Sequence, residues 1–130
     1  MCGLVGFIKI SSLMSGRNDE HKASDLNLLL RMVEMLAHRG PDDSGTWIDA
    51  NSGLSLAHRR LSIVDLSDAG HQPMVSTSGR YVIVFNGEIY NHHSMRKELD
   101  SSATPSKEIR AFNWRGHSDT ETLLACFETW

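Results

Sequence analysis

The spacing of apolar residues along the chain predicts two amphipathic helices. From Ser24 to Ala37, leucine, valine and alanine recur every three or four residues, which predicts a helix capped by Ser24. Near the end of the chain, residues 118–121 (Ser-Asp-Thr-Glu) have the form of an N-terminal capping box. The apolar positions of the helix expected after it are Leu123, Leu124 and Phe127.

Short apolar or alternating runs predict β-strands between these helices. They are residues 4–9, 46–49, 54–59 and 80–85. The last run (Arg-Tyr-Val-Ile-Val-Phe) is the strongest strand signal, and residues 50–53 are typical of a hairpin turn. We also expect a short helix at residues 92–99 and a short strand at residues 109–114.

Polar, glycine-rich and proline-rich stretches separate these elements. Residues 11–23 and 101–108 are typical of loops, and residues 40–45 (Gly-Pro-Asp-Asp-Ser-Gly) of a turn. Residues 61–66 are apolar but precede turn-forming residues, which indicates a strand end or an extended loop. The last helix reaches Trp130 without a capping residue, so we expect a domain truncated at its C-terminal side.

The composition argues against several classes of function. The 130 residues suit one domain, and a net charge of −3 without a basic run offers no surface for nucleic acid. No apolar run approaches the roughly 18 residues that a membrane span requires. The two cysteines, Cys2 and Cys126, and the seven histidines lack metal-ligand spacing, so we expect neither a disulfide framework nor a metal site. Cysteine usage fits a cytoplasmic protein.

Cys2 is the residue on which the functional interpretation depends. Met1 precedes a small residue and is of the kind that is commonly removed, which would leave Cys2 with a thiol and a free α-amine on one carbon. The thiolate is a strong nucleophile, and an α-amine is partly unprotonated near neutral pH and can accept a proton. Cys2 is therefore either a nucleophile with its own base or a small buried residue that begins the first strand.

Later segments carry side chains suited to an amino-acid substrate. Arg59 and Arg60 end an apolar strand, where arginines usually form a solvated edge, but a guanidinium in a cleft grips a carboxylate through two hydrogen bonds. Asn86 and Gly87 form either a hairpin turn or a pair of donors to an oxyanion. Asp119 is either an acid favoured by the helix dipole or an anionic anchor.

Five motifs occur in an order that resembles a known family. They are residues 2–7 (Cys-Gly-Leu-Val-Gly-Phe), 38–45 (His-Arg-Gly-Pro-Asp-Asp-Ser-Gly), 60–65 (Arg-Leu-Ser-Ile-Val-Asp), 86–91 (Asn-Gly-Glu-Ile-Tyr-Asn) and 118–121. Together they resemble the N-terminal glutaminase domain of glutamine-hydrolysing asparagine synthetases, which are class II glutamine amidotransferases. Other branches of this class differ at the second and third motifs. The resemblance implies the αββα sandwich of N-terminal-nucleophile hydrolases, with two mainly antiparallel sheets between helix layers.

The resemblance implies a role for each matched residue. Cys2, freed of Met1, resembles the nucleophile with its own α-amine as general base, and Asn86 and Gly87 resemble the oxyanion donors. Arg60 resembles the arginine that binds the α-carboxylate of glutamine. The other glutamine-binding residues that it implies are Leu61, Ser62, Ile63 and Val64, which line the pocket with their backbone, and Glu88 and Asp119, which face the α-ammonium.

The resemblance also implies cofactors and partners. The glutaminase half-reaction needs no metal or cofactor. A synthetase domain, absent from these residues, would use ATP and magnesium to make asparagine from aspartate and the released ammonia. Residues 1–130 are thus expected to form a partial type 2 glutamine amidotransferase domain with glutamine as substrate, and a homodimer is one assembly open to it.

Two other functions stay open beside glutamine hydrolysis. An inert glutamine-binding module would keep the Arg60 and Asp119 pocket without turnover, because Met1 is retained or the fold is incomplete. A different N-terminal-nucleophile hydrolase would act on another amide and would not select free glutamine. The acceptor of the ammonia is open as well, since many synthetase-like proteins aminate molecules other than aspartate.

Overall fold

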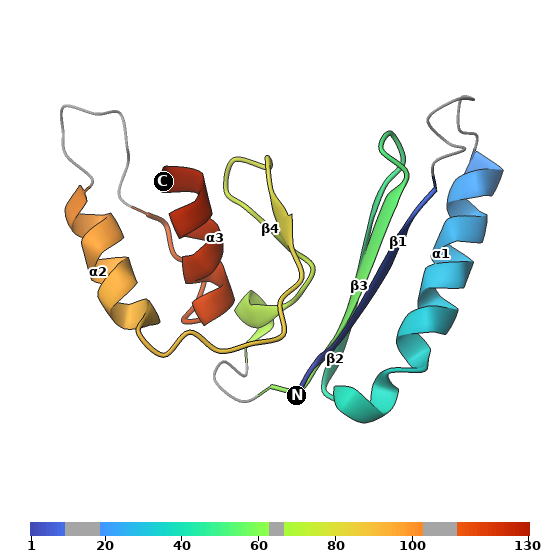
Figure 1. Cartoon of the computed structure of the whole chain (residues 1–130), viewed down its shortest axis with the longest axis horizontal. Helices are drawn as coiled ribbons and strands as arrows, with labels where there is room; N and C mark the ends of the chain where they lie inside the picture. The colour runs from blue at the N-terminus through green and yellow to red at the C-terminus, as the bar shows by residue number, and fades with distance from the viewer. Residues whose placement is uncertain (10–18, 63–66, 103–111) are drawn as a thin grey trace. The chain divides into compact units, whose positions relative to one another are not determined.

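The structure is a computed structural model that describes residues 1–9, 19–62, 67–102 and 112–130 (Figure 1). It contains two compact units, each of which has its own core. The first unit comprises Met1–Ser62, His71–Pro73 and Val84–Asn86, and the second comprises Ile63–Gly70, Met74–Ile83 and Gly87–Trp130. Within the described segments, no helix combines the length and the apolar character that crossing a membrane requires.

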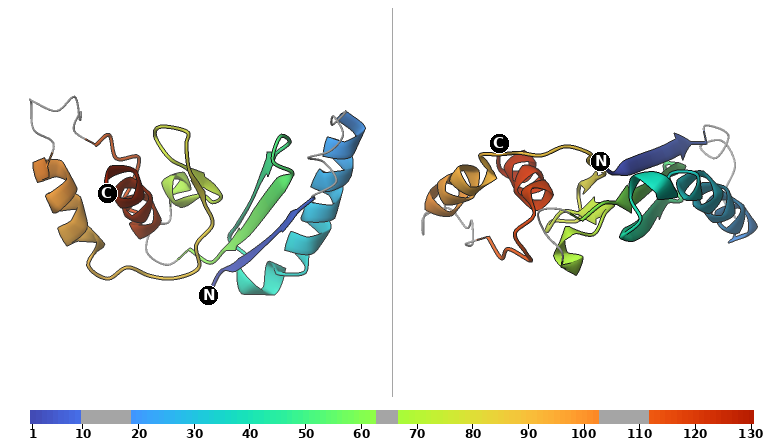
Figure 2. Two further views of the ribbon diagram at one scale, coloured as in Figure 1. Left: turned by 45° about the horizontal axis from the view of Figure 1, so that its top comes forward. Right: turned by 90° about the horizontal axis from the view of Figure 1, so that it is seen from below.

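The first unit is built on an antiparallel sheet with the strand order β1-β3-β2. Its strands are β1 (Gly3–Ile8), β2 (Asp43–Asp49) and β3 (Leu54–Arg60). The helix α1 (Asp19–Glu34) lies along one face of this sheet (Figures 1 and 2). A short 3-10 helix, η2 (Ala37–Arg39), follows α1. Because Gly3 pairs with Arg59, the N-terminus lies beside the C-terminal end of β3.

The core of the first unit forms between α1 and the sheet. Leu29 and Val33 are one helical turn apart and pack on Ala57 of β3, and none of the three is more than 2% exposed. Partly buried residues that complete the cluster are Val5, Phe7 and Ile48. Each fully buried aliphatic side chain of this kind stabilises a fold by about 1.5–3 kcal/mol, so this cluster fastens α1 to the strands.

The second unit contains a hairpin and two helices. Its elements are η3 (Asp68–Gly70), β4 (Met74–Val75), β5 (Val82–Ile83), α2 (His92–Ser102) and α3 (Asp119–Thr129). The strands β4 and β5 pair antiparallel. Leu99 of α2 packs with Ala125 and Cys126 of α3. The rings of Tyr81 and Phe127 meet edge to face at 5.4 Å, which joins α3 to the hairpin.

The expected fold class is confirmed. The protein is α+β with two antiparallel sheets, and α1 packs on the three-stranded one, which is consistent with an N-terminal-nucleophile hydrolase sandwich. Three predicted elements are confirmed with shifted ends: the strand at residues 4–9, the hairpin over residues 46–59 and the helix at residues 92–99.

The predicted start and end of the first helix were wrong. Ser24 is not its N-cap, because α1 begins at Asp19 and Ser24 is an exposed residue inside it. Lysine and alanine just before Ser24 have high helix propensity, so the helix extends through them. It ends at Glu34, and Ala37 belongs to η2 instead.

Two strand predictions were also wrong in extent. The run at residues 80–85 pairs only at Val82–Ile83, because its partner β4 has two residues. Residues 112–114 are not a strand, since their two aromatic rings stack at 5.1 Å and pack with α2 and α3. Residues 10–18 and 103–111, which include most of both predicted loops, lie outside the described residues.

Candidate functional site

Cys2 lies directly before β1 and beside the segment that follows β3. Its sulfur accepts a hydrogen bond from the Leu61 backbone N–H at 3.3 Å and lies 3.7 Å from the Leu61 carbonyl oxygen. The side chain is half-buried and its thiol is free. The pairing of β1 with β3 therefore brings the predicted nucleophile to the start of the predicted glutamine pocket.

Arg60 is the last residue of β3 and is only 8% exposed. The backbone around it is held by Asp42, a residue of the second sequence motif. The Asp42 N–H donates to the Arg60 carbonyl at 3.1 Å, and the Asp42 carboxylate accepts from the Ser62 N–H at 2.8 Å. The motif at residues 38–45, in which the sequence predicted a turn, thus holds the backbone of residues 60–62 in place through Asp42.

Gly40 supports the same segment from the other side. A Cβ atom at this position would lie 2.4 Å from the Arg59 carbonyl carbon and 2.6 Å from the Arg60 nitrogen. Only glycine allows such a close approach of two backbones. Gly40 and Asp42 were not predicted as site residues, although the dense motif at residues 38–45 was the signal that could have indicated them.

The residue before Asn86 is tied down by two side chains. The Phe85 N–H donates to the Gln72 side-chain oxygen at 2.6 Å, and the imidazole of His58 also forms a hydrogen bond with the Phe85 backbone. Gln72 is 6% exposed and His58 is 1% exposed. These contacts fix the backbone that leads to the exposed Asn86. Neither His58 nor Gln72 was predicted as a site residue, since nothing in the local sequence indicates that either side chain bonds to Phe85.

His58 is held as a neutral imidazole. Burial lowers its pKa most, and the charge of Arg60 adds to this effect, whereas the hydrogen bond to Phe85 and the charge of Asp43 oppose it. Within the described residues, its Nε2 atom has no hydrogen-bond partner. Burying an imidazolium under these conditions would be costly, so the neutral form is favoured.

In the second unit, Asp119 is the first residue of α3 and is 8% exposed. One carboxylate oxygen accepts from the Ile89 N–H at 2.8 Å, and the other accepts from the Thr120 N–H at 2.8 Å. Asp119 is thereby fastened to the residue after the exposed Glu88. Burial lowers the pKa of the nearby His92 most, and the charges of Asp119 and Glu88 oppose this effect.

The predicted capping box is only half formed. The Ser118 hydroxyl accepts from the Thr120 N–H at 3.2 Å, which confirms Ser118 as the N-cap of α3. Glu121 instead accepts hydrogen bonds from the backbone N–H groups of Arg115 at 2.8 Å and Gly116 at 3.2 Å. Its carboxylate therefore holds the loop before α3.

The predicted site residues fall into two groups. In the first unit are Cys2, Arg60, Leu61, Ser62 and Asn86, and in the second are Gly87, Glu88 and Asp119. Ile63 and Val64 lie outside the described residues. Across the described segments, His, Cys, Asp and Glu side chains form no group of three that could hold a metal ion.

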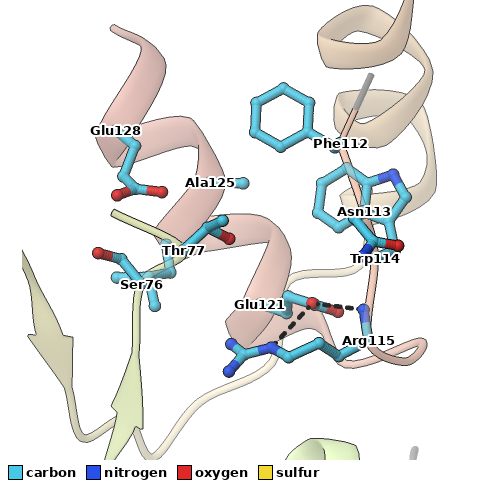
Figure 3. A pocket seen from close by; sticks show the side chains of 10 residues that line it. Ser76, Thr77, Phe112, Asn113, Trp114, Arg115, Glu121, Ala125 and Glu128 are labelled. Carbon is cyan, nitrogen blue, oxygen red and sulfur yellow. Dashed lines mark hydrogen bonds and ion pairs between the residues drawn. The ribbon is translucent and has the colours of Figure 1, made fainter. Parts of the chain in front are cut away.

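A pocket in the second unit contains none of the predicted site residues. It lies between the hairpin at Ser76 and Thr77, the segment from Phe112 to Arg115, and α3 (Figure 3). Two carboxylates line it, Glu121 and Glu128. Burial acts to raise the pKa of Glu128, but the hydrogen bonds that its carboxylate accepts from the Ser78 N–H and hydroxyl outweigh this effect and help to lower the pKa. Both carboxylates of this pocket therefore already accept hydrogen bonds from the protein, Glu121 from residues 115–116 and Glu128 from Ser78.

Comparisons with known proteins agree with the geometry. A family model described as a glutamine amidotransferase domain matches residues 1–130. The glutamine-hydrolysing asparagine synthetase 1 of Bacillus subtilis is 37% identical over 98% of this chain and 17% of that protein. Asparagine synthetase B of Escherichia coli, also glutamine-hydrolysing, is 35% identical over 98% of this chain and 20% of that protein. Amidase chry2 of Gibberella zeae is 32% identical over 98% of this chain and 18% of that protein. The chain thus spans about a fifth of these relatives.

Proposed function

We propose that this chain, which belongs to the glutamine amidotransferase domain family, hydrolyses glutamine to glutamate and ammonia with Cys2 as the nucleophile. One observation carries the proposal: the Cys2 sulfur lies 3.3 Å from the Leu61 nitrogen, directly after the buried Arg60. A nucleophile and a cationic anchor for a carboxylate thus lie at the same end of two paired strands. An amino acid held there by its carboxylate would be oriented for attack.

The reaction begins once Met1 has been removed. Met1 is 77% exposed, which suits removal by an aminopeptidase. The freed α-amine of Cys2 takes the proton of the thiol. The thiolate then attacks the carbon of the glutamine side-chain carboxamide, and the electron pair of the C=O bond moves onto oxygen to give a tetrahedral oxyanion.

Asn86 and Gly87 stabilise this oxyanion through the Asn86 amide and the Gly87 N–H. A donor of this kind lowers the activation barrier by about 2.7–4 kcal/mol. Two hydrogen bonds of the Phe85 backbone support the assignment, because they hold the chain next to Asn86: the Phe85 N–H donates to the Gln72 side-chain oxygen, and the His58 imidazole also bonds to Phe85.

The intermediate collapses with cleavage of the C–N bond. The leaving nitrogen takes the proton back from the α-ammonium of Cys2 and departs as ammonia, which leaves a γ-glutamyl thioester. Water, deprotonated by the same amine, attacks the thioester and releases glutamate and the Cys2 thiol.

Glutamine carries an α-carboxylate and an α-ammonium, and the protein has a candidate partner for each. We further propose that Arg60 binds the α-carboxylate next to the backbone of Leu61 and Ser62, and that Glu88 and Asp119 bind the α-ammonium. The 8% exposure of both Arg60 and Asp119 supports these roles, since charge pairs are stronger where water is excluded.

The ammonia passes to a second reaction. The names of the Bacillus and Escherichia relatives support synthesis of asparagine from aspartate, which an ATP- and magnesium-dependent synthetase domain would carry out. The relative named an amidase favours a second candidate, in which the ammonia or the acyl group goes to a different acceptor. Glutamine hydrolysis at Cys2 is common to both.

Replacing each cysteine in turn tests the proposal. Cys2→Ala should abolish glutamate release from glutamine, because alanine has no nucleophile. Cys126→Ala is the matched control, since Cys126 is 5% exposed in the core of the second unit and should keep activity in proportion to its folded fraction. Undiminished glutamate release by Cys2→Ala would refute the mechanism.

A further inference from the structure

Arg96 of α2 is a largely buried arginine whose role the reaction does not explain. Its side chain is 11% exposed, and its guanidinium lies 4.1 Å from the centre of the Trp114 ring. The ring stabilises such a stacked cation, but removing its charge from water costs free energy that other contacts must offset.

The guanidinium donates to four groups around the start of α3. The acceptors are the Thr122 hydroxyl at 2.7 Å, the Gly116 carbonyl at 2.6 Å, the Ser118 carbonyl at 2.8 Å and the Glu121 carboxylate at 3.2 Å. They span residues 116–122, so one side chain holds both sides of the turn that carries Asp119. A planar fork of donors can do this, whereas the single ammonium of lysine cannot.

The charge of Arg96 is already balanced. Glu121, whose side chain is 8% exposed, lies 3.2 Å from one guanidinium nitrogen and also contacts Arg115 (Figure 3). Arg96 is therefore not free to bind the carboxylate of a substrate. Its contacts act on the backbone next to Asp119 instead.

A continuous chain of contacts links Arg96 to the predicted ammonium-binding pair. Arg96 holds the Ser118 carbonyl, Asp119 follows in the sequence, and the Asp119 carboxylate accepts from the Ile89 N–H at 2.8 Å. Ile89 is the neighbour of Glu88. Displacement of the turn would thus move Asp119 away from Ile89 and separate the two carboxylates.

We propose that Arg96 is a positioning residue for the α-ammonium subsite of glutamine, a role that rests on the proposed function. Arg96 does not touch the substrate. It fixes the Asp119 carboxylate beside Glu88, and so determines how strongly the protein selects an amino acid over the same amide without an α-ammonium.

Substrate discrimination tests this role. We compare kcat/KM for glutamine with kcat/KM for glutaramate, which is glutamine without its α-ammonium. In Arg96→Lys the ratio should fall by about tenfold, the change expected when a charge-assisted contact is lost. The ratio does not depend on the fraction of folded enzyme, so a loss of stability alone would not change it.

The control is Arg80→Lys, which alters an exposed arginine in the same unit and should leave the ratio unchanged. If Arg96→Lys fails to fold, Thr122→Val keeps the test, because it removes one acceptor of Arg96 at similar volume and should lower the ratio in the same direction. An unchanged ratio in the folded variant overturns the proposal.

A second readout separates this proposal from the proposed function. Hydrogen exchange of the Ile89 amide reports its bond to Asp119 without any turnover. If the parent chain does not hydrolyse glutamine, the proposed function fails, and the Ile89 amide alone decides the role of Arg96. Faster exchange of this amide in Arg96→Lys than in Arg80→Lys supports positioning, and equal exchange overturns it.

Discussion

Neighbouring residues of β3 have very different surroundings. His58 and Arg60 are two apart and so share a face of the strand, and they are 1% and 8% exposed. Arg59 lies on the other face, 3.9 Å from the exposed Glu34 of α1. The resemblance had assigned carboxylate binding to Arg60, and the burial of Arg60 gives a physical reason for that choice.

Arg60→Lys should weaken glutamine binding. Lysine keeps the charge but loses the two-pronged grip on a carboxylate, so KM for glutamine should rise by a factor that corresponds to about 2 kcal/mol. Arg59→Lys is the matched control and should change KM little, because its ion pair with Glu34 is weak and exposed. A normal KM in Arg60→Lys would mean that the side chain has only a structural role.

The buried imidazole of His58 predicts how stability depends on pH. Its folded pKa lies below the ordinary value of 6.5, so the unfolded chain binds a proton more readily. The contribution of His58 is complete above about pH 6.5 and is lost as the pH falls toward the folded pKa. The urea midpoint should therefore drop between about pH 7 and pH 5.

The substitution His58→Gln isolates this effect. The drop in the urea midpoint between about pH 7 and pH 5 should become smaller in this variant. It should not vanish, because His92, whose pKa is also lowered chiefly by burial, contributes in the same direction. His38→Gln, at an exposed position, is the control and should keep the full drop in the urea midpoint. An equal drop in His58→Gln and the parent chain would show that His58 does not titrate in this range.

At the scale of elements, periodicity predicted helices and strands where burial repeats regularly. It failed where a partner sets the length, as in the strong strand signal at residues 80–85, which forms only the two-residue β5 opposite β4. Sequence pattern also failed at a glycine-rich motif that proved to be part of a strand. Asp43–Gly45 looked like a turn and is the start of β2, with Gly45 beside the Gln72 carbonyl.

The motif at residues 38–45 should be intolerant of a single methyl group. Gly40→Ala would push a Cβ against the Arg59–Arg60 peptide, and we expect a loss of about 2–3 kcal/mol together with a raised KM for glutamine. Gly79→Ala is the contrasting control. It meets open space but has a positive φ of 72°, so it should cost about 1 kcal/mol and leave KM unchanged.

Both quantities can be measured on each variant by urea unfolding and steady-state kinetics. The prediction for Gly40 depends on close approach and not on backbone strain, because its φ is −152°. If Gly40→Ala and Gly79→Ala have the same KM, residues 40–42 do not support the glutamine pocket.

At the scale of the whole chain, the sequence indicated the residues with distinctive chemistry but not those that hold them in place. Cys2, Arg60, Asn86 and Asp119 stand in motifs whose residue types suit a zwitterionic amide. Arg96 stands in no motif, and its partner Gly116 is 20 residues away. Such contacts depend on how α2 packs on α3, which no local pattern encodes.

The most direct test of Cys2 as the nucleophile is the intact mass of the purified chain before and after incubation with 6-diazo-5-oxo-norleucine, a glutamine-shaped electrophile. We expect Met1 to be absent and a single adduct to form at Cys2, with Cys126 unmodified. Burial raises the pKa of the Cys126 thiol, which keeps that residue unreactive. Excess glutamine should slow the labelling. A chain that has lost Met1 and still forms no adduct, or labels equally at Cys126, would contradict a glutamine-binding nucleophile at Cys2.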